Sequence, residues 1–315
     1  SFGSSPPACA CAPLPASAMS ANTADFANAD SALDLGNIRR CLMRMEDSII
    51  FSLIERSQYK VNSAVYEEDC PQLGAFRLHQ LKSAGSNGSL GDYFIYQTEC
   101  LHSQVRRFKH PTEFSFFGPL PEPSLHSTSG GRTDSAPILA EVPRSAVVND
   151  RLLDIYRRRM VPKLCEEGDD GNHGSTAVQD VHCLQTMATR IYYGLFVAES
   201  KYRSETETAE KLIRAADREG LMAFVTKPEV EAKNIQRVIA KARAFSQNIW
   251  VGDQAGHQPL APCEETTYKI EPEYIGTVFR EYLMPLTKDV EVEYLLTRSS
   301  SSPSAKRRRM STDDN

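Results

Sequence analysis

The sequence predicts an all-α protein, a bundle of several helices that forms one domain. Apolar residues recur at spacings of three and four over long segments, which is the pattern of one face of an amphipathic helix. Strand-like alternation of apolar and polar residues is scarce. With 315 residues, of which 41% are hydrophobic, the chain is also long enough to bury a full core.

The first expected helix runs from Leu35 to about Arg56, because its apolar residues share one stripe. The stripe comprises Ile38, Leu42, Met45, Ile49 and Leu53. Shorter helical patterns cover about 89–109, 149–166, 206–219, 228–249 and 272–297.

A second long helix is expected after the segment GDDGNHGSTAVQD, residues 168–180. Its stripe comprises Val178, Val181, Leu184, Met187, Ile191 and Leu195. The segment lacks the spacing of a calcium loop and the Gly-Lys-Ser/Thr of a phosphate loop. Two interpretations stay open: a solvated loop with a helix cap, or a helix start that offers backbone N–H groups to an anion.

The breaks in the helical pattern fall at 84–91, at the proline-rich stretch 118–145 and at 252–269. None resembles a tether between independent domains, so one helical domain is expected over residues 32–298. The Ala/Ser/Pro-rich head, 1–31, is predicted to be disordered or the remainder of a transit peptide. The Ser-rich tail, 299–315, is also predicted to be disordered, although its KRRR cluster could be a nuclear address.

Composition excludes several functions. The net charge of -5 argues against a nucleic-acid partner. No apolar run approaches the roughly 20 residues of a membrane span, so no membrane partner is expected. The eight cysteines form no C-x-x-C or Cys/His ligand pattern. They indicate a reducing compartment without a structural metal site.

Cations recur where helix faces should be apolar. Arg190 and Lys201 are eleven residues apart, which is about three helical turns, so both project from one face. Gly194 and Val197 lie between them. Two cations above a floor of small residues would suit a dianion, although a solvated face is the alternative interpretation.

Two further helices carry paired polar residues. Arg39 and Glu46 are seven residues apart and share a face, while Thr287 and Glu291 are i, i+4 neighbours. The second pair follows Pro285, which must interrupt the helical hydrogen bonding. Spacing alone predicts a helical protein with a possible anion pocket and names no reaction.

At these residues the chain resembles the eukaryotic branch of the all-helical chorismate mutases. The resemblance runs from Ala32 to Arg298 and is carried by five long blocks. These are NIRRCLMRMEDSIIFSLIERSQY (37–59), VRRFKHPTEFSFFGPLPEP (105–123), GDDGNHGSTAVQDVHCLQ (168–185), RIYYGLFVAESKY (190–202) and MPLTKDVEVEYLLTR (284–298).

The resemblance implies a homodimeric isomerase that converts chorismate to prephenate for phenylalanine and tyrosine synthesis. The reaction is a pericyclic rearrangement, and the family uses no metal or other cofactor. Such an enzyme must hold a flexible dicarboxylate in its reactive conformer and stabilise charge on the breaking ether oxygen.

The resemblance also implies catalytic roles. Arg39 and Arg190 would bind the substrate carboxylates, and Thr287 would border one of them. Lys201 would contact the ether oxygen together with Glu291, which can donate only when protonated, so a raised pKa and activity favoured below neutral pH are implied. Glu231 would contact the region of the substrate hydroxyl.

Two neighbouring positions, Glu46 and Lys227, are not assigned to catalysis. Glu46 is expected to be a structural charge partner near the site. Lys227 departs from the family pattern, because fungal members carry Asn there; the contact to the hydroxyl would then come from the backbone.

The segment 168–180 gains a role from the resemblance. In regulated members, a Gly-Ser pair at this helix start binds an amino acid effector at the dimer interface, and an Arg-Arg pair of the partner chain completes the site. Gly174 and Ser175 match the first pair, Arg106 and Arg107 match the second, and Asn172 would add a contact. Inhibition by tyrosine and activation by tryptophan are implied.

Two alternatives to the enzyme remain open at this point. One is a catalytically silent protein on the same fold that senses aromatic amino acids, and the other is a nuclear interaction protein directed by KRRR. The expected location is the plastid (chloroplast) or the cytoplasm, and secretion is not expected because no apolar signal core is visible.

Overall fold

The computed structural model describes residues 29–124, 138–248 and 267–298. Within these ranges the secondary structure consists of helices and turns and contains no β-strand. A single β-bridge pairs Gln247 with Tyr268. The prediction of an all-α fold is confirmed. The α-helices are α1 Ala29–Leu33, α2 Leu35–Ser57, α3 Gly74–Ser83, α4 Leu90–Gln104, α5 Asn149–Ile155, α6 Val161–Leu164, α7 His173–Tyr192, α8 Gly194–Ser204, α9 Thr206–Arg214, α10 Arg218–Val225, α11 Pro228–Ser246, α12 Pro272–Thr277 and α13 Met284–Arg298.

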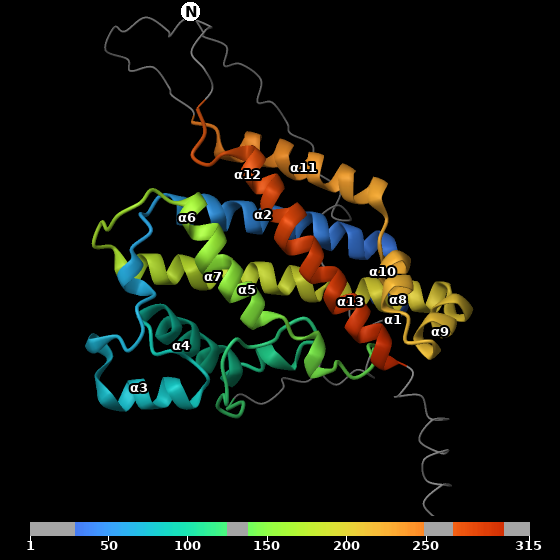
Figure 1. Ribbon diagram of the computed structural model, residues 1–315, viewed down its shortest axis with the longest axis horizontal. Coiled ribbons are helices and arrows are strands. Elements are labelled where there is room, and N and C mark those ends of the chain that lie inside the picture. Colours follow the sequence, from blue (N-terminus) through green and yellow to red (C-terminus); the bar gives the residue numbers. More distant parts are fainter. Residues whose placement is uncertain (1–28, 125–137, 249–266, 299–315) are drawn as a thin grey trace, which may run out of the picture.

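The bundle is built around α2 and α7, which pack side by side through the centre of the molecule (Figure 1). Helix α13 crosses them and packs on α7, α8 and α10, while α11 lies along α2 and α12. Helix α4 packs on the opposite part of α7, and α3 is at that edge of the bundle. Helices α2, α8, α11 and α13 therefore surround a common region near the middle of the molecule.

Helix α2 begins where the sequence predicts, because Asp34 caps it. The Asp34 carboxylate accepts the backbone N–H of Asn37 at 2.8 Å. Three residues of its apolar stripe, Ile38, Ile49 and Leu53, are at most 1% exposed, and Leu42 and Met45 are partly buried. Burying one such side chain contributes roughly 1.5–3 kcal/mol, so the stripe fixes the face that α2 turns toward α7.

A buried polar cluster joins α2 to α7. Arg56 of α2 is fully buried and donates from Nε to Asp180 of α7 at 2.7 Å. The hydroxyls of Tyr66 and Tyr156 donate to the same carboxylate at 2.8 and 2.6 Å. Burial nevertheless raises the pKa of Asp180, while Arg56 and the tyrosines oppose that shift. The cluster sets the register of the two central helices.

Two segments adopt the wider π-helical turn, and each directly precedes a proline-containing helix. Residues 156–160 lead into α6, whose second residue is Pro162, and residues 278–283 lead into α13, whose second residue is Pro285. A proline ring clashes with the carbonyl four residues earlier in an α-helix. A π-turn shifts that carbonyl, so the chain continues as a helix through the interruption that Pro285 predicts.

Several helix boundaries differ from the sequence prediction. The expected helix 206–219 is two helices, α9 and α10, because Ala216 has a left-handed backbone (φ 49°) and Asp217 caps a new helix through Gly220 N–H. The expected helix 89–109 ends at α4, since Arg106 is also left-handed (φ 66°). Helix α3 was not expected, because much of it is exposed and its apolar stripe is weak.

Other predicted helical segments are divided into more than one helix. The patterns at 149–166 and 272–297 are each two α-helices joined by a π-helical segment. The predicted stripe from Val178 to Leu195 is divided between α7, which begins at His173, and α8, which follows at once and contains Leu195. Its first residue, Val178, is 52% exposed and lies outside the core. The head up to residue 28 and the tail from residue 299, including KRRR, lie outside the described residues.

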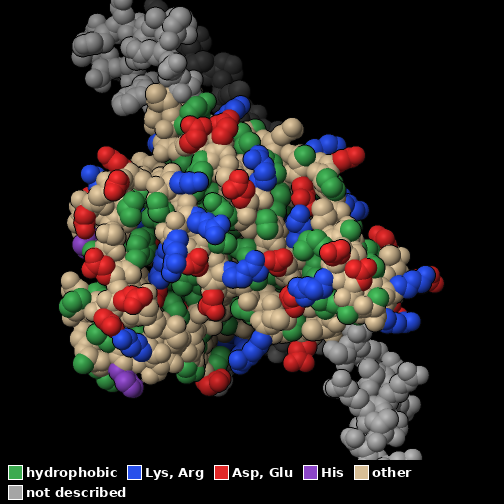
Figure 2. All heavy atoms as spheres, in the orientation of Figure 1, with side chains coloured by type: hydrophobic (Ala, Val, Ile, Leu, Met, Phe, Trp, Pro, Cys, Tyr) green, Lys and Arg blue, Asp and Glu red, His purple; other side chains and the backbone are tan. Residues whose placement is uncertain are grey.

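The described part of the chain offers no helix long and apolar enough for a membrane span. On the face drawn in Figure 2, basic and acidic side chains are interspersed. Five cysteines of the described residues are free thiols: Cys41, Cys70, Cys100, Cys165 and Cys183.

Candidate active site

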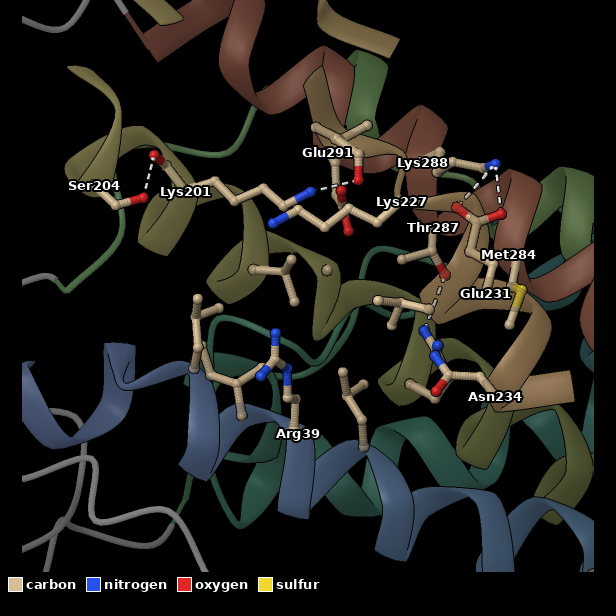
Figure 3. Close-up of a pocket in the computed structure, with 18 of the residues that line it drawn as sticks. Arg39, Lys201, Ser204, Lys227, Glu231, Asn234, Met284, Thr287, Lys288 and Glu291 are labelled. Carbon is tan, nitrogen blue, oxygen red and sulfur yellow. Dashed lines mark hydrogen bonds and ion pairs between the residues drawn. The ribbon is translucent and has the colours of Figure 1, made fainter. Parts of the chain in front are cut away.

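A cavity of about 280 Å³ lies between α2, α7, α8, α11 and α13 (Figure 3). The structure brings all six predicted catalytic residues to its wall. These are Arg39, Arg190, Lys201, Glu231, Thr287 and Glu291. The lining also includes the apolar side chains of Ile38, Leu42, Val197 and Val225, so the wall combines charged and apolar groups. Such a mixture suits a small polar ligand.

The junction of α7 and α8 puts two cations on one wall. The helical path continues through Tyr193, whose backbone is right-handed. Arg190 and Lys201 therefore line the same cavity, as their spacing predicts. Gly194 lies between them and faces α13. A Cβ atom at Gly194 would lie 2.7 Å from Cγ2 of Thr287 and 3.2 Å from Oε1 of Glu291, so only glycine allows this close approach.

Arg190 is held in place without being fully satisfied. Its Nη1 donates to the Thr287 hydroxyl at 3.1 Å, and that hydroxyl donates in turn to the Leu283 carbonyl at 2.7 Å. Among the described residues, Nε of Arg190 is buried and has no hydrogen-bond partner. A buried donor of this kind needs an acceptor. A ligand carboxylate in the cavity would supply one, because a guanidinium binds it in a fork.

Glu291 is buried on α13 and faces the cations. Burial raises the pKa of this carboxyl group to about 8, while Lys201 and Arg190 act in the opposite direction. The predicted rise of this pKa is confirmed in direction. Near neutral pH the group is therefore mainly protonated and can donate a hydrogen bond to a ligand oxygen.

Lys201 is anchored at the end of α10. Its ammonium group donates to the carbonyl of Val225 and, at 3.4 Å, to that of Phe224. These carbonyls belong to the negative end of a helix, which favours a cation. Burial lowers the pKa of Lys201, and Glu291 opposes that shift. One donor direction of the ammonium can still serve the cavity, since a lysine carries three N–H donors.

The wall formed by α11 is held by ion pairs. Lys288 bonds both carboxylate oxygens of Glu231 at 3.2 and 3.3 Å (Figure 3). The buried Glu46 lies outside the lining and pairs with Arg237 at 2.6 Å and with Lys241 at 3.1 Å, so its contacts are those of a structural charge partner.

Among the polar lining residues that sequence reasoning missed are Lys288 and Asn234. Helix arithmetic offered a signal for both, because Lys288 is three residues before Glu291 and Asn234 is three residues after Glu231.

The mouth of the cavity carries two more cations. Arg39 rises from α2 toward the cavity and is exposed (Figure 3). Lys227, on the turn before α11, is also exposed and lines the cavity. Exposed cations at an entrance attract an anion before buried groups bind it.

The predicted effector residues lie in two separate places. Gly174 and Ser175 are exposed in the first turn of α7, where backbone N–H groups have no acceptor within the helix. Asn172 precedes this turn, and its N–H donates to Asp170 at 2.9 Å. Asp170 also accepts the Lys60 N–H at 3.0 Å, so the loop is firmly built.

The arginine pair follows α4 and lies beside a later part of α7. Arg107 donates to Glu113 at 2.7 Å and to Gln185 at 3.0 Å. Gln185 is ten residues from Ser175, which is about 15 Å along a helix. Arg106 has a left-handed backbone, and its buried Nε lacks a partner within the described residues. One chain therefore does not bring the two halves together, and completion by a partner chain stays a prediction.

Within the described ranges, no group of three or more His, Cys, Asp and Glu side chains could hold a metal ion.

Comparison with known proteins identifies the fold and the family. The profile of chorismate mutase type II matches residues 173–292. "Chorismate mutase 1, chloroplastic" of Petunia hybrida is 40% identical over 290 residues, which span 91% of this chain and 83% of that protein. The crystal structure of a chorismate mutase from Candida albicans in complex with L-tryptophan is 33% identical, with a TM-score of 0.75 over 90% of this chain and 99% of that one. AtCM1 with tyrosine bound in its allosteric site is 39% identical, with a TM-score of 0.68 over 84% and 96% of the two chains.

Proposed function

The chain belongs to the type II chorismate mutases, and on this premise we propose how its own residues carry out and control the reaction. It is an isomerase that converts chorismate to prephenate on the route to phenylalanine and tyrosine. The observation that supports the site most strongly is the convergence of Arg39, Arg190, Lys201 and Glu291 on one cavity.

The reaction needs the substrate folded so that its two ends meet. Chorismate is a flexible dicarboxylate, and most of its conformers cannot react. In our proposal Arg190, oriented by Thr287, binds one carboxylate from within the cavity, and Arg39 binds the other from the entrance. Fixing both carboxylates at set positions would select the compact conformer, in which the two reacting ends meet.

The transition state places negative charge on the breaking ether oxygen. Lys201 and protonated Glu291 would each donate a hydrogen bond to this oxygen. Both donors are held before the substrate enters, Lys201 by the end of α10 and Glu291 by the α8–α13 contact. Glu231, paired with Lys288, would face the ring hydroxyl. In this mechanism the residues act only through hydrogen bonds and charge, and they form no covalent bond to the substrate.

The test is turnover of chorismate by the purified chain. Arg190→Ala is expected to lower kcat/KM by about 10²- to 10³-fold, because it removes a donor set that the transition state needs. Arg280→Ala, an exposed arginine outside the cavity, is the matched control and is expected to behave as wild type. Equal activity of the Arg190 and Arg280 variants would refute the proposed site.

We further propose that tyrosine inhibits and tryptophan activates this enzyme. AtCM1 binds tyrosine in its allosteric site, and the Candida albicans enzyme binds L-tryptophan. In this chain Gly174 and Ser175, at the α7 N-terminus, would bind the amino acid carboxylate. Arg106 and Arg107 of a second copy would complete the site in a homodimer, with Asn172 as a further contact.

The proposed location is the plastid or the cytoplasm. The plastid is favoured because the Petunia hybrida relative is named as chloroplastic. Fluorescence imaging of the tagged natural protein would distinguish the two compartments.

A further inference from the structure

The charges that line the cavity are unbalanced. Five cationic and three acidic side chains face it: Arg39, Arg190, Lys201, Lys227, Lys288, Glu205, Glu231 and Glu291. Lys288 and Glu231 neutralise each other as a pair. Glu291 is mainly protonated near neutral pH, since burial raises its pKa to about 8. The cavity therefore holds excess positive charge before any ligand enters.

The backbone fixes where Lys227 stands. Pro228 begins α11 and confines Lys227 to an extended backbone, with φ −131° and ψ 89°. The Lys227 carbonyl accepts the N–H groups of Val230 and Glu231, both at 3.0 Å, and so closes the first turn of the helix. With its backbone held on both sides, Lys227 can direct its side chain into the cavity mouth.

The Lys227 ammonium lies beside that of Lys201, and the two side chains run toward each other (Figure 3). After burial and the opposing effect of Glu291, the charge of Lys227 is a further cause that lowers the pKa of Lys201. Within the described residues, no hydrogen bond or ion pair holds the Lys227 ammonium. Two converging ammonium groups repel each other, and an anion between them relieves that repulsion.

We propose that Lys227 is a further substrate-binding residue, whose ammonium group binds the substrate carboxylate nearest the ether oxygen. This inference rests on the proposed function, in which Lys201 contacts that oxygen. The ether oxygen of chorismate is bonded to the carbon that carries one of the two carboxylates. A substrate held by Lys201 therefore brings this carboxylate to the neighbouring ammonium group.

The position of Lys227 also decides which step it serves. Lys227 is exposed at the entrance, so it attracts the dianion and stabilises the bound ground state and the transition state about equally. Uniform binding of this kind lowers KM and changes kcat little.

The test compares Lys227→Met, Lys227→Asn and Lys227→Arg with wild type in steady-state turnover of chorismate. The control is Lys233→Met on α11, an exposed lysine that does not line the cavity. At low salt, the Met and Asn variants are expected to raise KM about tenfold and to change kcat less than threefold. Lys227→Arg, which keeps the charge, is expected to restore KM to within about threefold of wild type. In 0.5 M NaCl the difference between Lys227→Met and wild type is expected to shrink, because salt screens exposed charges.

The outcomes separate this inference from the proposed function. Wild type without turnover would overturn the proposed function, and the inference with it. Wild type with turnover and a Lys227→Met variant of unchanged KM would overturn the role of Lys227 alone. A loss confined to kcat, or one that Lys227→Arg does not repair, would also contradict binding through charge.

Discussion

Glu291 shows how a single residue gains its chemistry from its surroundings. A carboxyl group in water is ionised at neutral pH and cannot donate a hydrogen bond. Burial against α8, which only Gly194 permits, raises its pKa to about 8. The same side chain on an exposed helix face would have no role at the ether oxygen.

The raised pKa of Glu291 gives a pH dependence with a definite sign. The active form is protonated, so kcat is expected to fall as pH rises through about 8, by up to tenfold per pH unit. Glu291→Gln donates an N–H at every pH, so its kcat is expected to stay flat between pH 7 and 9. The measurement is kcat for both proteins across that range. An identical alkaline fall in the two proteins would assign it to another group, with Lys201 as the first candidate because burial lowers its pKa.

At the scale of elements, the contact between α8 and α13 sets the geometry of the site. Gly194→Ala would place a methyl group 2.7 Å from Thr287 Cγ2 and force the helices apart. Overpacking of this kind costs about 1–3 kcal/mol of unfolding free energy. Because the shift moves Thr287 and Glu291, kcat/KM is expected to fall by about 10- to 100-fold.

The control for this prediction is Gly118→Ala, an exposed glycine outside the cavity whose added Cβ would meet no atom within 4 Å. Turnover by each variant, with thermal unfolding to measure stability, tests the contact. Wild-type kcat/KM in Gly194→Ala would mean that the helices tolerate the separation.

The contact between α2 and α7 depends on a different chemistry. Asp180→Asn would leave the fully buried Arg56 without its counter-charge. Breaking a buried ion pair in this way is expected to cost about 3–5 kcal/mol of unfolding free energy. The exposed pair Arg158–Asp154 is the control, since Arg158→Ala is expected to cost at most about 0.5 kcal/mol. Urea unfolding of both variants measures the difference, and equal costs would show that the cluster is not needed for packing.

For the molecule as a whole, the proposed regulation requires two chains. Leu101 and Val105 at the end of α4, and Val178 on α7, are 61%, 50% and 52% exposed. These apolar side chains lie close in sequence to the proposed effector residues, which supports a homodimer whose interface would cover them. Sedimentation is expected to give twice the chain mass of 35.1 kDa.

Effector control should depend on the arginine that lacks a partner. Arg106→Ala is expected to raise the tyrosine concentration for half-inhibition at least tenfold, because it removes a charged contact to the carboxylate. Lys109→Ala, an exposed neighbour, is the control. Turnover at increasing tyrosine concentrations measures both. Unchanged inhibition in Arg106→Ala would place the effector elsewhere.

The all-α fold and the placement of the cavity cations could be predicted from the sequence, whereas details that depend on packing could not. Arg190 and Lys201 could be placed on one wall because helix spacing is regular. The turn at Ala216 was not predictable, since a left-handed alanine has no sequence signature. The partners of Glu231 and Arg190 depend on the crossing of α11 and α13 over the other helices, which no local pattern encodes. The roles of the effector residues depend on a second chain and remain predictions.

In the proposed mechanism, the cavity between α2, α8, α11 and α13 performs the rearrangement through a donor to the ether oxygen. The most direct measurement is kcat for chorismate conversion by Lys201→Ala, with Lys211→Ala on α9 as the control and circular dichroism to verify folding. We predict a fall in kcat of at least about 100-fold for Lys201→Ala and wild-type turnover for the control. A folded Lys201→Ala variant with wild-type kcat would contradict the account.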